Sequence, residues 1–505
     1  MLAAGAAAAL AAGALLASSA GSPSKAATQE PCDIYAAAGT PCVAAHSTTR
    51  ALYAAYDGPL YQVRRSSTNT TTDIYPLSAG GVANAATQNS FCSGTTCVIT
   101  EIFDQSGHSN NLTDAPAGGA AGGPDGLANA TAAAVEVGGH AAYGVYIAAG
   151  DGYRDDSTSG IATGNASEGE YEVLDGTHYD NGCCYDYGNA ETNNDDDGAG
   201  AMEAIYFGDA TAWGTGSGSG PWIMADMENG LFSGEGAKLN SGDPSISHRF
   251  TTAMIEGGAN LWAILGGNAQ SGSLSTFYSG VRPSGYNPMK KQGAIILGIG
   301  GDNSDNSAGT FYEGVLTSGY PTAATEAAVQ ANIVSVGYAN YTLPSNPFTA
   351  GAEVSLNATT PCCTGDYLTG DYPSSDEVGI DSVTSSSSAT IKEDATWIIE
   401  PGLANSSCVS FKSANGSGDY IRHFDFELYL EPSDGTTQFA LDATFCPRAG
   451  NSGSGYSFMS YQYSYDYIRH YNFVGYIASD GGSNSFDASS LWNEDSTWNA
   501  VSPWS

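Results

Sequence analysis

Positively charged residues are scarce in this sequence. Among its 505 residues, Lys and Arg number 15 and Asp and Glu number 53, so the formal net charge is −38 at pH 7. Phosphate backbones and anionic membrane surfaces repel such a chain. The composition therefore argues against nucleic acid and against a membrane as partners.

Long apolar runs are lacking beyond the N-terminus. Residues 1–20 are almost wholly Ala, Leu, Gly and Ser, and Gly-Ser-Pro-Ser-Lys-Ala-Ala follows them. An apolar core with small residues at the cleavage site is typical of a secretory signal, although the usual basic start is missing. A transmembrane anchor is the alternative, but the run is rich in Ala. We predict a signal peptide over residues 1–26 and a secreted, extracellular protein.

Several catalytic motifs are also absent. The sequence has no Gly-X-Ser-X-Gly elbow in a strand–turn–helix setting, no His-Glu-X-X-His motif and no P-loop. Asn193, Asp195 and Asp197 resemble the first half of a calcium loop, but its twelfth position is Ala204 rather than Glu. A solvated acidic loop explains this stretch better, and we expect neither a metal nor another cofactor.

Helical periodicity is scarce, and the exception is the amphipathic pattern of Thr322–Ser335. The 65 Gly and 30 Tyr residues fit a β-rich protein with many turns. Segments such as Leu60–Val63 and Cys97–Phe103 predict short strands separated by turn clusters, as in a β-sandwich. The chain is too long for one ordinary core. We predict an all-β protein with a sandwich over residues 27–338 and a linker over 339–348.

The ten cysteines indicate an oxidising compartment. A disulfide between adjacent residues, such as Cys183 and Cys184, closes a small ring and kinks the backbone. Among the neighbouring tyrosines it could offer a rigid apolar ledge to a sugar, although each Cys pairing elsewhere is the alternative. Asn-X-Ser/Thr sequons further predict a glycoprotein. The expected pairs are Cys32–Cys42, Cys92–Cys97, Cys183–Cys184, Cys362–Cys363 and Cys408–Cys446.

An internal repeat occupies the C-terminal part of the chain. Asp-Ala-Thr-Trp, Asp-Ala-Thr-Phe and Asp-Ser-Thr-Trp begin at Asp394, Asp442 and Asp495, which are 48 and 53 residues apart. Tyr420–Phe424 is echoed by Tyr467–Tyr471, 47 residues later. Three strand-rich repeats of this length predict a β-trefoil over residues 349–505.

The repeats differ in one polar pair. The second contains His423 with Asp442 and the third His470 with Asp495, whereas Gly370 replaces the His in the first. A purely structural pair should recur in all three repeats. We therefore predict two working pockets and one degenerate site, with hydrogen-bonded core histidines as the alternative.

Two acidic segments are candidates for catalysis. In a strand from Gly220 to Gly230, Trp222, Asp226 and Glu228 would share one face, where unpaired buried carboxylates are costly. A solvent-facing strand end is the alternative. The apolar run Ala294–Ile299 leads into Gly300-Gly301-Asp302-Asn303, which places a second carboxylate, Asp302, at a strand end. Paired carboxylates in a secreted β protein indicate glycoside hydrolysis.

These motifs resemble a known family. Residues from about 31 to 338 resemble the catalytic domain of glycoside hydrolase family 54, the fungal α-L-arabinofuranosidases. Residues from about 349 to 505 resemble carbohydrate-binding module family 42, through their Arg-His and Asp-Ala-Thr repeats. The carrying motifs of the first part are Pro31–Tyr35, Thr177–Tyr179 with Cys183-Cys184, Trp222–Asn229 and Gly300–Asn303.

The resemblance implies a concanavalin-like sandwich that retains anomeric configuration, with Glu228 as nucleophile and Asp302 as general acid/base. Gly370 and Cys362-Cys363 depart from the family pattern in the first trefoil repeat. Implied sugar contacts are Cys183, Cys184, Trp213, Asp226, Asn229 and Gly301 in the sandwich, and His423, Asp442, His470 and Asp495 in the trefoil.

The implied function is that of a monomeric exo-α-L-arabinofuranosidase. It would remove terminal L-arabinofuranose from arabinoxylan, arabinan and related plant cell-wall polysaccharides, which are its expected partners. Two alternatives are a non-catalytic lectin-like protein and the same fold acting on another furanoside or a β-xyloside.

Overall fold

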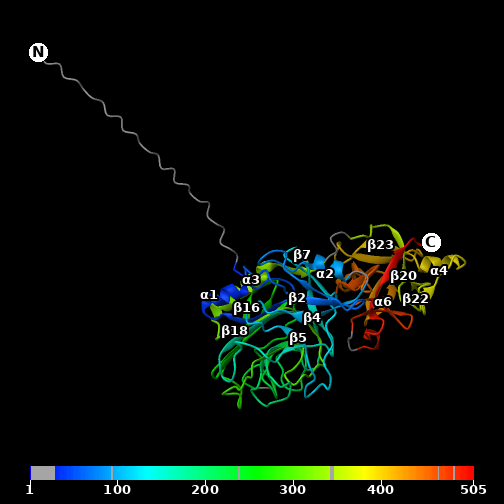
Figure 1. The fold of residues 1–505 in the computed structure, drawn as a ribbon. Coiled ribbons are helices and arrows are strands. Elements are labelled where there is room, and N and C mark those ends of the chain that lie inside the picture. Colours follow the sequence, from blue (N-terminus) through cyan, green and yellow to red (C-terminus); the bar gives the residue numbers. More distant parts are fainter. Residues whose placement is uncertain (2–28, 93–94, 237–238, 342–345, 464–465, 481–483) are drawn as a thin grey trace.

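The structure is a computed structural model that describes residue 1 and residues 29–92, 95–236, 239–341, 346–463, 466–480 and 484–505 (Figure 1). Apart from Met1, the predicted signal peptide lies outside the described residues. Strands dominate, so the expected all-β class is confirmed. None of the described helices is long and apolar enough to cross a membrane. The helices are α1 (Pro31–Ala38), α2 (Ala85–Phe91), α3 (Ala323–Val336), α4 (Ala389–Asp394), α5 (Thr437–Asp442), α6 (Trp492–Asp495) and the 3₁₀ turn η1 (Ser485–Asp487).

Two antiparallel sheets pack face to face in the N-terminal domain. Residues from both, such as Ile205 and Ile223 on one sheet and Ile255 and Phe311 on the other, form one buried cluster. The first sheet has the order β16 (Ser271–Gly280), β15 (Leu261–Asn268), β14 (Thr251–Gly258), β9 (Glu168–Tyr179), β18 (Gly309–Ser318), β7 (His140–Ile147), β6 (Ala133–Val137), β19 (Tyr338–Asn340), with β1 (Cys42–Ser47) pairing β18. The second has the order β13 (Leu231–Phe232), β12 (Trp222–Asp226), β11 (Glu203–Gly208), β10 (Asp186–Ala190), β17 (Ala294–Leu297), β8 (Tyr153–Asp155), β5 (Leu112–Asp114), β4 (Cys97–Ile102), β2 (Tyr61–Arg65), β3 (Thr71–Ile74).

Helix α3 covers the outer face of the first sheet, and it is the helix that the sequence predicts. Thr322 caps it by accepting a hydrogen bond from the Thr325 amide at 3.2 Å. Its buried face mixes Val329 and Ile333 with polar residues, which is less apolar than the predicted amphipathic pattern. Glu326 can be buried because it accepts a hydrogen bond of 2.6 Å from the Tyr35 hydroxyl of α1.

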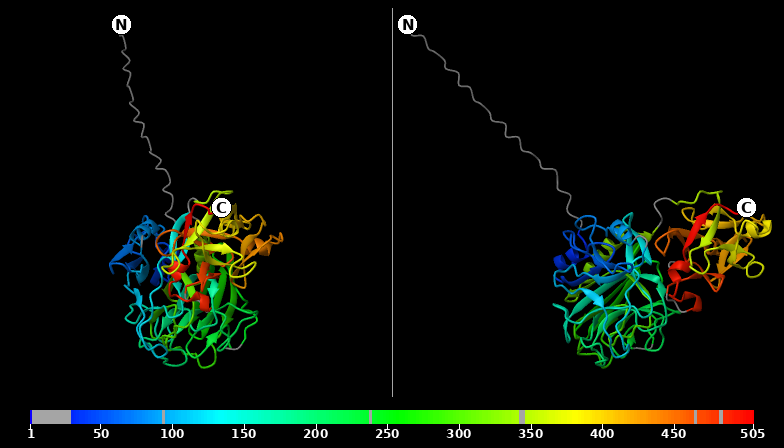
Figure 2. Two further views of the ribbon diagram at one scale, coloured as in Figure 1. Left: turned by 90° about the vertical axis from the view of Figure 1, so that its right-hand side faces the viewer. Right: turned by 45° about the vertical axis from the view of Figure 1, so that its right-hand side comes forward.

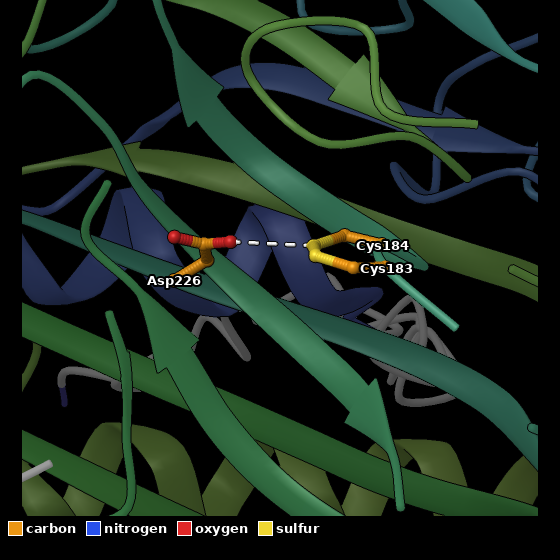
Figure 3. Close-up of side chains that lie close together, drawn as sticks. All are labelled: Cys183, Cys184 and Asp226. Atoms are coloured by element: carbon orange, nitrogen blue, oxygen red, sulfur yellow. Dashed lines mark hydrogen bonds between the residues drawn. A yellow bond between two sulfur atoms is a disulfide. The ribbon is translucent and has the colours of Figure 1, made fainter. Parts of the chain in front are cut away.

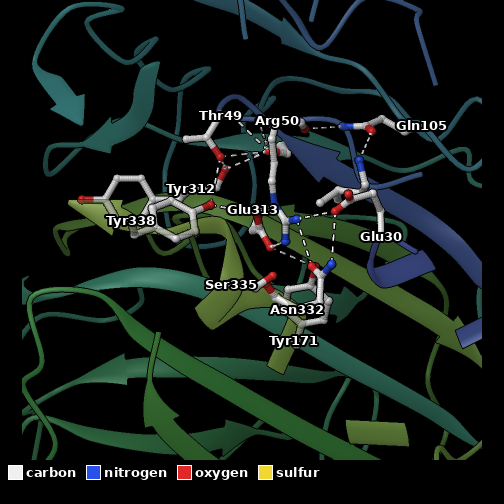
Figure 4. A network of polar contacts seen from close by, with 12 residues as sticks. Glu30, Thr49, Arg50, Gln105, Tyr171, Tyr312, Glu313, Asn332, Ser335 and Tyr338 are labelled. Carbon is white, nitrogen blue, oxygen red and sulfur yellow. Dashed lines mark hydrogen bonds and ion pairs between the residues drawn. The ribbon is translucent and has the colours of Figure 1, made fainter. Parts of the chain in front are cut away.

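A buried ion network joins α1, α3 and β18 (Figure 4). Arg50 contacts both carboxylate oxygens of Glu313, through Nε at 2.5 Å and Nη2 at 2.6 Å. Its Nη1 contacts Glu30 at 2.7 Å and Asn332 at 2.9 Å. Buried charges are tolerated when they are paired and fully hydrogen-bonded, as here. The network fixes the chain at Glu30, directly before the first helix.

The C-terminal domain is a twelve-stranded β-trefoil, as the repeat predicts. Its pseudo-symmetry extends to single contacts: the indole of Trp397 donates to the Leu368 carbonyl, and that of Trp498 to the Ile468 carbonyl, both at 3.0 Å. The strands are β20 (Glu353–Ala358), β21 (Asp366–Gly370), β22 (Val378–Ser382), β23 (Trp397–Pro401), β24 (Val409–Ser413), β25 (Tyr420–Phe424), β26 (Glu427–Glu431), β27 (Phe445–Ala449), β28 (Tyr456–Ser460), β29 (Tyr467–Tyr471), β30 (Val474–Ala478) and β31 (Trp498–Val501).

The two domains lie side by side, with the trefoil next to α2 (Figures 1 and 2). Strand β19 pairs with β6 of the sandwich, so Ala339 and Asn340, which the predicted linker includes, belong to the sheet. Residues 342–345 of that linker lie outside the described part. All five predicted cysteine pairs are disulfides in the structure.

Candidate active site

A cavity of about 520 Å³ lies over the outer face of the second sheet, where β17, β10, β11 and β12 are neighbours. It brings together every residue that we predicted for the catalytic domain, from both acidic segments and from the vicinal disulfide. The lining residues are Asn181, Gly182, Cys183, Cys184, Asp196, Ala212, Trp213, Asp226, Glu228, Asn229, Gly230, Leu231, Gly300, Gly301, Asp302, Ser304 and Asn306.

Strand β12 shows the alternation that its sequence predicts, but it is shorter. Trp222 and Met224 pack on the cavity side with the disulfide, while Ile223 and Ala225 enter the core between the sheets. The strand ends at Asp226, so the prediction that Glu228 lies on it is wrong. Glu228 lies instead in the turn between β12 and β13.

The turn holds Glu228 in an unusual backbone conformation. Its φ is +63° and that of Asn229 is +57°, a left-handed region that costs a non-glycine residue about 1–2 kcal/mol. Two hydrogen bonds stabilise it: the Glu228 amide donates to Asp226 Oδ1 at 2.9 Å, and the Tyr286 hydroxyl donates to the Glu228 carbonyl at 2.8 Å. Glu228 thereby lines the same cavity as Asp226, the last residue of the strand.

Asp302 lies in a tight loop rather than at a strand end, because β17 already ends at Leu297. The Ser304 amide donates to Asp302 Oδ1 at 3.1 Å, and the Asp302 carbonyl accepts from the Ala120 amide at 2.9 Å. The next residue, Asn303, has a φ of +64° and donates to Asp125 Oδ1 at 2.9 Å. Contacts at both ends of the residue therefore fix its position at the cavity.

Glu191 is a buried acid of this site that we did not predict. It follows β10, is 0% exposed, and its carboxylate occupies the space where a Cβ on Gly301 would lie. A residue with a side chain at position 301 would therefore clash with the Glu191 carboxylate. Arg154 contacts the carbonyl oxygens of both segments, Gly301 through Nη1 at 2.8 Å and Glu191 through Nη2.

Burial and neighbouring charges raise the pKa values of the carboxyl groups of the site. Burial, followed by the charges of Glu191 and Asp226, raises the pKa of Glu228 to about 10. Burial raises the pKa of Glu191 to about 7. Burial, with the charges of Glu191 and Asp302, also raises the pKa of Asp226 to about 7. Glu191 and Glu228 are close enough to share a proton. At neutral pH this pair retains one proton between two carboxyl groups.

The buried cations near this cluster make their direct contacts with other groups. Arg154 contacts the backbone carbonyl oxygens of Gly301 and Glu191, and its charge acts to lower the pKa of Glu191. Arg282 and Lys291 both contact the Glu203 carboxylate, at 2.5 Å and 3.0 Å. Glu203 belongs to the opposite face of β11 from Ala204, which pairs with Asp226. The acids of the cavity therefore depend on shared protons rather than on ion pairs with these two cations.

Asp186, at the start of β10, is a second acid that we did not predict. Burial and then the charge of Asp226 raise its pKa well above the usual range. A protonated Asp186 can donate a hydrogen bond to Asp226. Asp186 lies within the short stretch Tyr185–Ala190 and Glu191 directly follows it. The alternating Tyr185 and Tyr187 of this stretch were a usable sign of a buried strand.

The vicinal disulfide lies directly against Asp226 (Figure 3). Cys184 Sγ is 3.5 Å from Asp226 Oδ2. A disulfide sulfur carries no hydrogen, so this contact is a hydrogen bond only when Asp226 is protonated. The trio could be mistaken for a metal site, but oxidised cysteines offer no thiolate ligands. The disulfide presents an apolar surface here, and the Trp213 side chain, which also lines the cavity, is 47% exposed.

Replacement of Glu191 by Gln is expected to flatten the pH dependence of stability. Because burial raises the pKa of Glu191 from 4.5 to about 7, the folded state holds this proton more tightly than the unfolded state. That stabilisation is complete below about pH 4.5 and is lost as the pH rises through 7, by up to about 1.4 kcal/mol per pH unit. The wild-type melting temperature should fall between pH 5 and 8, and Glu191→Gln should reduce this fall.

The measurement is the midpoint of thermal unfolding at several pH values across that range. Glu235→Gln, at an exposed glutamate, is the matched control and should follow the wild type. Parallel profiles for Glu191→Gln and the wild type would show that Glu191 does not hold the proton.

The second trefoil repeat contains an open pocket of about 570 Å³ around His423 and Asp442. His423 Nε2 is 3.8 Å from Asp442 Oδ1, and Arg422 Nη1 is 3.0 Å from Asp442 Oδ2. Burial and the neighbouring Arg422 lower the pKa of His423 to about 4. The imidazole is therefore neutral at neutral pH and can act as a hydrogen-bonding partner for a hydroxyl group.

In the third repeat a hydroxyl group already bridges the corresponding pair. His470 Nε2 is 3.6 Å from Asp495 Oδ1, and the Thr360 hydroxyl is 2.7 Å from each of these atoms. In the first repeat, Thr369 and Gly370 stand where the others have Arg and His. A Cβ on Gly370 would meet Leu430 at 2.8 Å, so the space of the missing His is filled.

The two parts of the chain match two family models. The model described as "Alpha-L-arabinofuranosidase B, catalytic" matches residues 31–339, and "Alpha-L-arabinofuranosidase B (ABFB) domain" matches residues 356–500. The chain belongs to the α-L-arabinofuranosidase B family. It is therefore a glycoside hydrolase, and the predicted resemblance to family 54 is confirmed.

Curated α-L-arabinofuranosidases align with this chain over nearly all its length. A probable α-L-arabinofuranosidase B of Aspergillus terreus is 61% identical over 475 residues, which are 93% of each chain. An α-L-arabinofuranosidase of Hypocrea jecorina is 58% identical over 472 residues, 92% of this chain and 94% of its own. A relative from Trichoderma koningii, also 58% identical over 472 residues and with the same coverage of both chains, is named as an arabinofuranosidase/B-xylosidase.

Solved α-L-arabinofuranosidase structures share this fold. A family 54 enzyme soaked with a cyclic sulfate inhibitor has a TM-score of 0.74 and 55% identity, over 94% of this chain and 100% of its own. A second, complexed with arabinofuranosyl-α-1,2-xylobiose, has the same TM-score and coverage at 54% identity.

Proposed function

We propose that this chain removes terminal α-L-arabinofuranosyl residues from arabinose-substituted xylan and related plant polysaccharides, with retention of configuration. The main support for this assignment is that Glu228 and Asp302 line the same cavity, although they are 74 residues apart in the sequence. The complex of a relative with arabinofuranosyl-α-1,2-xylobiose supports the choice of substrate. The five disulfides support secretion, which we propose as well.

In the proposed mechanism, Glu228 attacks the anomeric carbon while Asp302 donates a proton to the departing glycosidic oxygen. This forms a covalent arabinosyl-enzyme and a free xylan hydroxyl. Asp302 then takes a proton from water, the water oxygen attacks the anomeric carbon, and Glu228 leaves as a carboxylate. Retention requires the two carboxyl groups to act from opposite faces of the sugar, about 5–5.5 Å apart.

Glu228 must be an anion to attack, whereas its raised pKa favours the protonated form in the absence of a sugar. The proton that it shares with Glu191 must lie on Glu191 when the sugar is bound, so that Glu191 donates a hydrogen bond to the attacking carboxylate. Asp226, held by the Glu228 amide and by protonated Asp186, is then free to accept a hydrogen bond from a furanose hydroxyl. Trp213 and the disulfide provide the apolar surfaces for the ring.

The deciding experiment is proton NMR of arabinoxylan during the first minutes of digestion. We expect free arabinose that appears first as the α-anomer and then mutarotates. Release of the β-anomer first would contradict retention of the anomeric configuration. Binding of the polysaccharide without release of sugar would favour a lectin-like protein. The name of the Trichoderma koningii relative makes a β-xyloside the second substrate to assay.

Substitutions in the trefoil are expected to separate binding from catalysis. His423→Ala and His470→Ala should each weaken retention on arabinoxylan about tenfold, because each removes a buried hydrogen-bonding group. Asp394→Ala should have little effect, since the first repeat lacks the His. The measurement is affinity electrophoresis on arabinoxylan gels, with turnover of an aryl arabinofuranoside as the control. Equal losses for all three variants would contradict a degenerate first site.

A further inference from the structure

A second cavity, of about 260 Å³, lies between the sandwich and the trefoil. We call it the interdomain cavity, and it shares none of its lining residues with the catalytic cavity. On the sandwich side it is formed by α2, β6 and β7, and on the trefoil side by β27 and β29. The lining residues are Asn89, Cys92, Thr95, Thr131, Ala134, Tyr143, Tyr341, Arg448, Ala449, Gly450, Asn451, Gly453 and Tyr467.

Arg448 is a buried cation, and none of the described residues that line this cavity has a carboxylate to pair with it. It is 4% exposed, and within the described part of the chain its Nε and Nη1 have no hydrogen-bond partner. Its Nη2 is 3.6 Å from the Met459 sulfur, and its guanidinium lies 4.9 Å from the ring centre of Tyr341. A buried charge that lacks a counter-ion destabilises the folded protein. The site therefore favours an anion that enters with its own negative charge.

The trefoil fold itself does not require this arginine. Glu400 and Val501 stand at the equivalent positions of the first and third repeats, 48 residues before and 53 residues after Arg448. Glu400 is partly exposed and Val501 is 38% exposed. The same strand position thus accepts a carboxylate or an aliphatic side chain, and the arginine is specific to the repeat that faces the sandwich.

The groups around Arg448 suit a carboxylate on a sugar ring. The Tyr143 hydroxyl donates to Asn89 Oδ1 at 2.6 Å. Burial raises the pKa of Tyr467, although the charge of Arg448 and a hydrogen bond with it act to lower that pKa, so the Tyr467 hydroxyl is neutral and lies beside the guanidinium. A guanidinium binds a carboxylate through two parallel hydrogen bonds. Tyrosine rings offer flat faces to the C–H groups of a pyranose and hydroxyl groups to its oxygens.

We propose that the interdomain cavity binds a hexuronate, a sugar residue whose carboxylate pairs with Arg448. The anion site follows from the buried arginine alone, and the choice of a sugar rests on the proposed function in polysaccharide hydrolysis. The site would let the enzyme recognise acidic substituents of a polysaccharide at a place separate from both the catalytic cavity and the His–Asp pairs of the trefoil.

The test is calorimetric titration of the full chain with methyl α-D-glucuronide, methyl α-D-glucoside and acetate. We expect the glucuronide to bind at least tenfold more tightly than either of the other two. Arg448→Gln should lose this binding, Arg448→Lys should weaken it because the bidentate pair is lost, and Lys290→Gln, at an exposed lysine, should keep it. Binding of acetate and glucuronide with equal affinity would overturn the sugar assignment.

A second readout separates the proposal from a purely structural role. Turnover of an aryl arabinofuranoside should be the same in Arg448→Gln and the wild type, and the melting temperature should not fall, because a buried unpaired charge is removed. Failure of the wild type to bind the glucuronide, with a lower melting temperature in Arg448→Gln, would overturn the proposal and make Arg448 a domain clamp. Since the titration needs no hydrolysis, its outcome is independent of whether the arabinofuranosidase assignment holds.

Discussion

Glu228→Gln is expected to lower kcat/KM for an aryl α-L-arabinofuranoside by at least about 10⁴-fold. Gln cannot form the covalent arabinosyl-enzyme, and loss of a catalytic nucleophile has effects of this size in other hydrolases. Gln has nearly the same shape as Glu, so the left-handed turn and the hydrogen bond from Tyr286 to the backbone carbonyl should persist. The loss should therefore lie in kcat rather than in the fold of the site.

The same substitution should stabilise the protein at neutral pH. The pKa of Glu228 is raised to about 10 by burial and by Glu191 and Asp226, so its ionisation opposes folding above its ordinary pKa. Gln removes that penalty, and the melting temperature at pH 7 should rise. Glu235→Gln is the matched control and should leave turnover and stability unchanged. Turnover close to wild type in Glu228→Gln would refute the nucleophile assignment.

The features predicted most successfully from sequence are those encoded by local repetition. The Asp-Ala-Thr-aromatic repeats predict the trefoil because each aromatic side chain occupies the same buried place, as Trp397, Phe445 and Trp498 do. The disulfides join cysteines that are near in sequence. Helix α1 was missed although its signals are present, since Pro31 opens it and Glu30 with Asp33 forms a capping box.

The catalytic groups were only partly predictable. Alternation along β12 correctly assigns Asp226 to the cavity, but it cannot show that the strand ends before Glu228. Asn229-Gly230 is a turn signal, but positive φ values are rare for Glu, so the sequence gives no reason to place Glu228 itself inside the turn. Glu191 and Asp186 acquire their high pKa values because β10 is central in the second sheet, and that burial depends on strands from distant parts of the chain.

Asp302→Ala is expected to lower kcat/KM for arabinoxylan by about 10²–10⁴-fold, the usual contribution of general acid catalysis. A substrate with an activated leaving group, such as a dinitrophenyl arabinofuranoside, needs little protonation and should lose much less in the first step. Its arabinosyl-enzyme should then accumulate, because no base activates water. The expected kinetic trace is a burst of dinitrophenolate followed by slow turnover.

Azide distinguishes this role from that of Glu228, because azide attacks without help from a base. In Asp302→Ala it should restore fast turnover and yield α-L-arabinofuranosyl azide, since two successive inversions retain the configuration. In Glu228→Ala azide can occupy the space of the lost carboxylate, and one inversion should give the β-azide. Absence of rescue in Asp302→Ala would move the acid/base role to another carboxyl of the cavity. Asp196 would then be the first candidate, because it also lines the cavity.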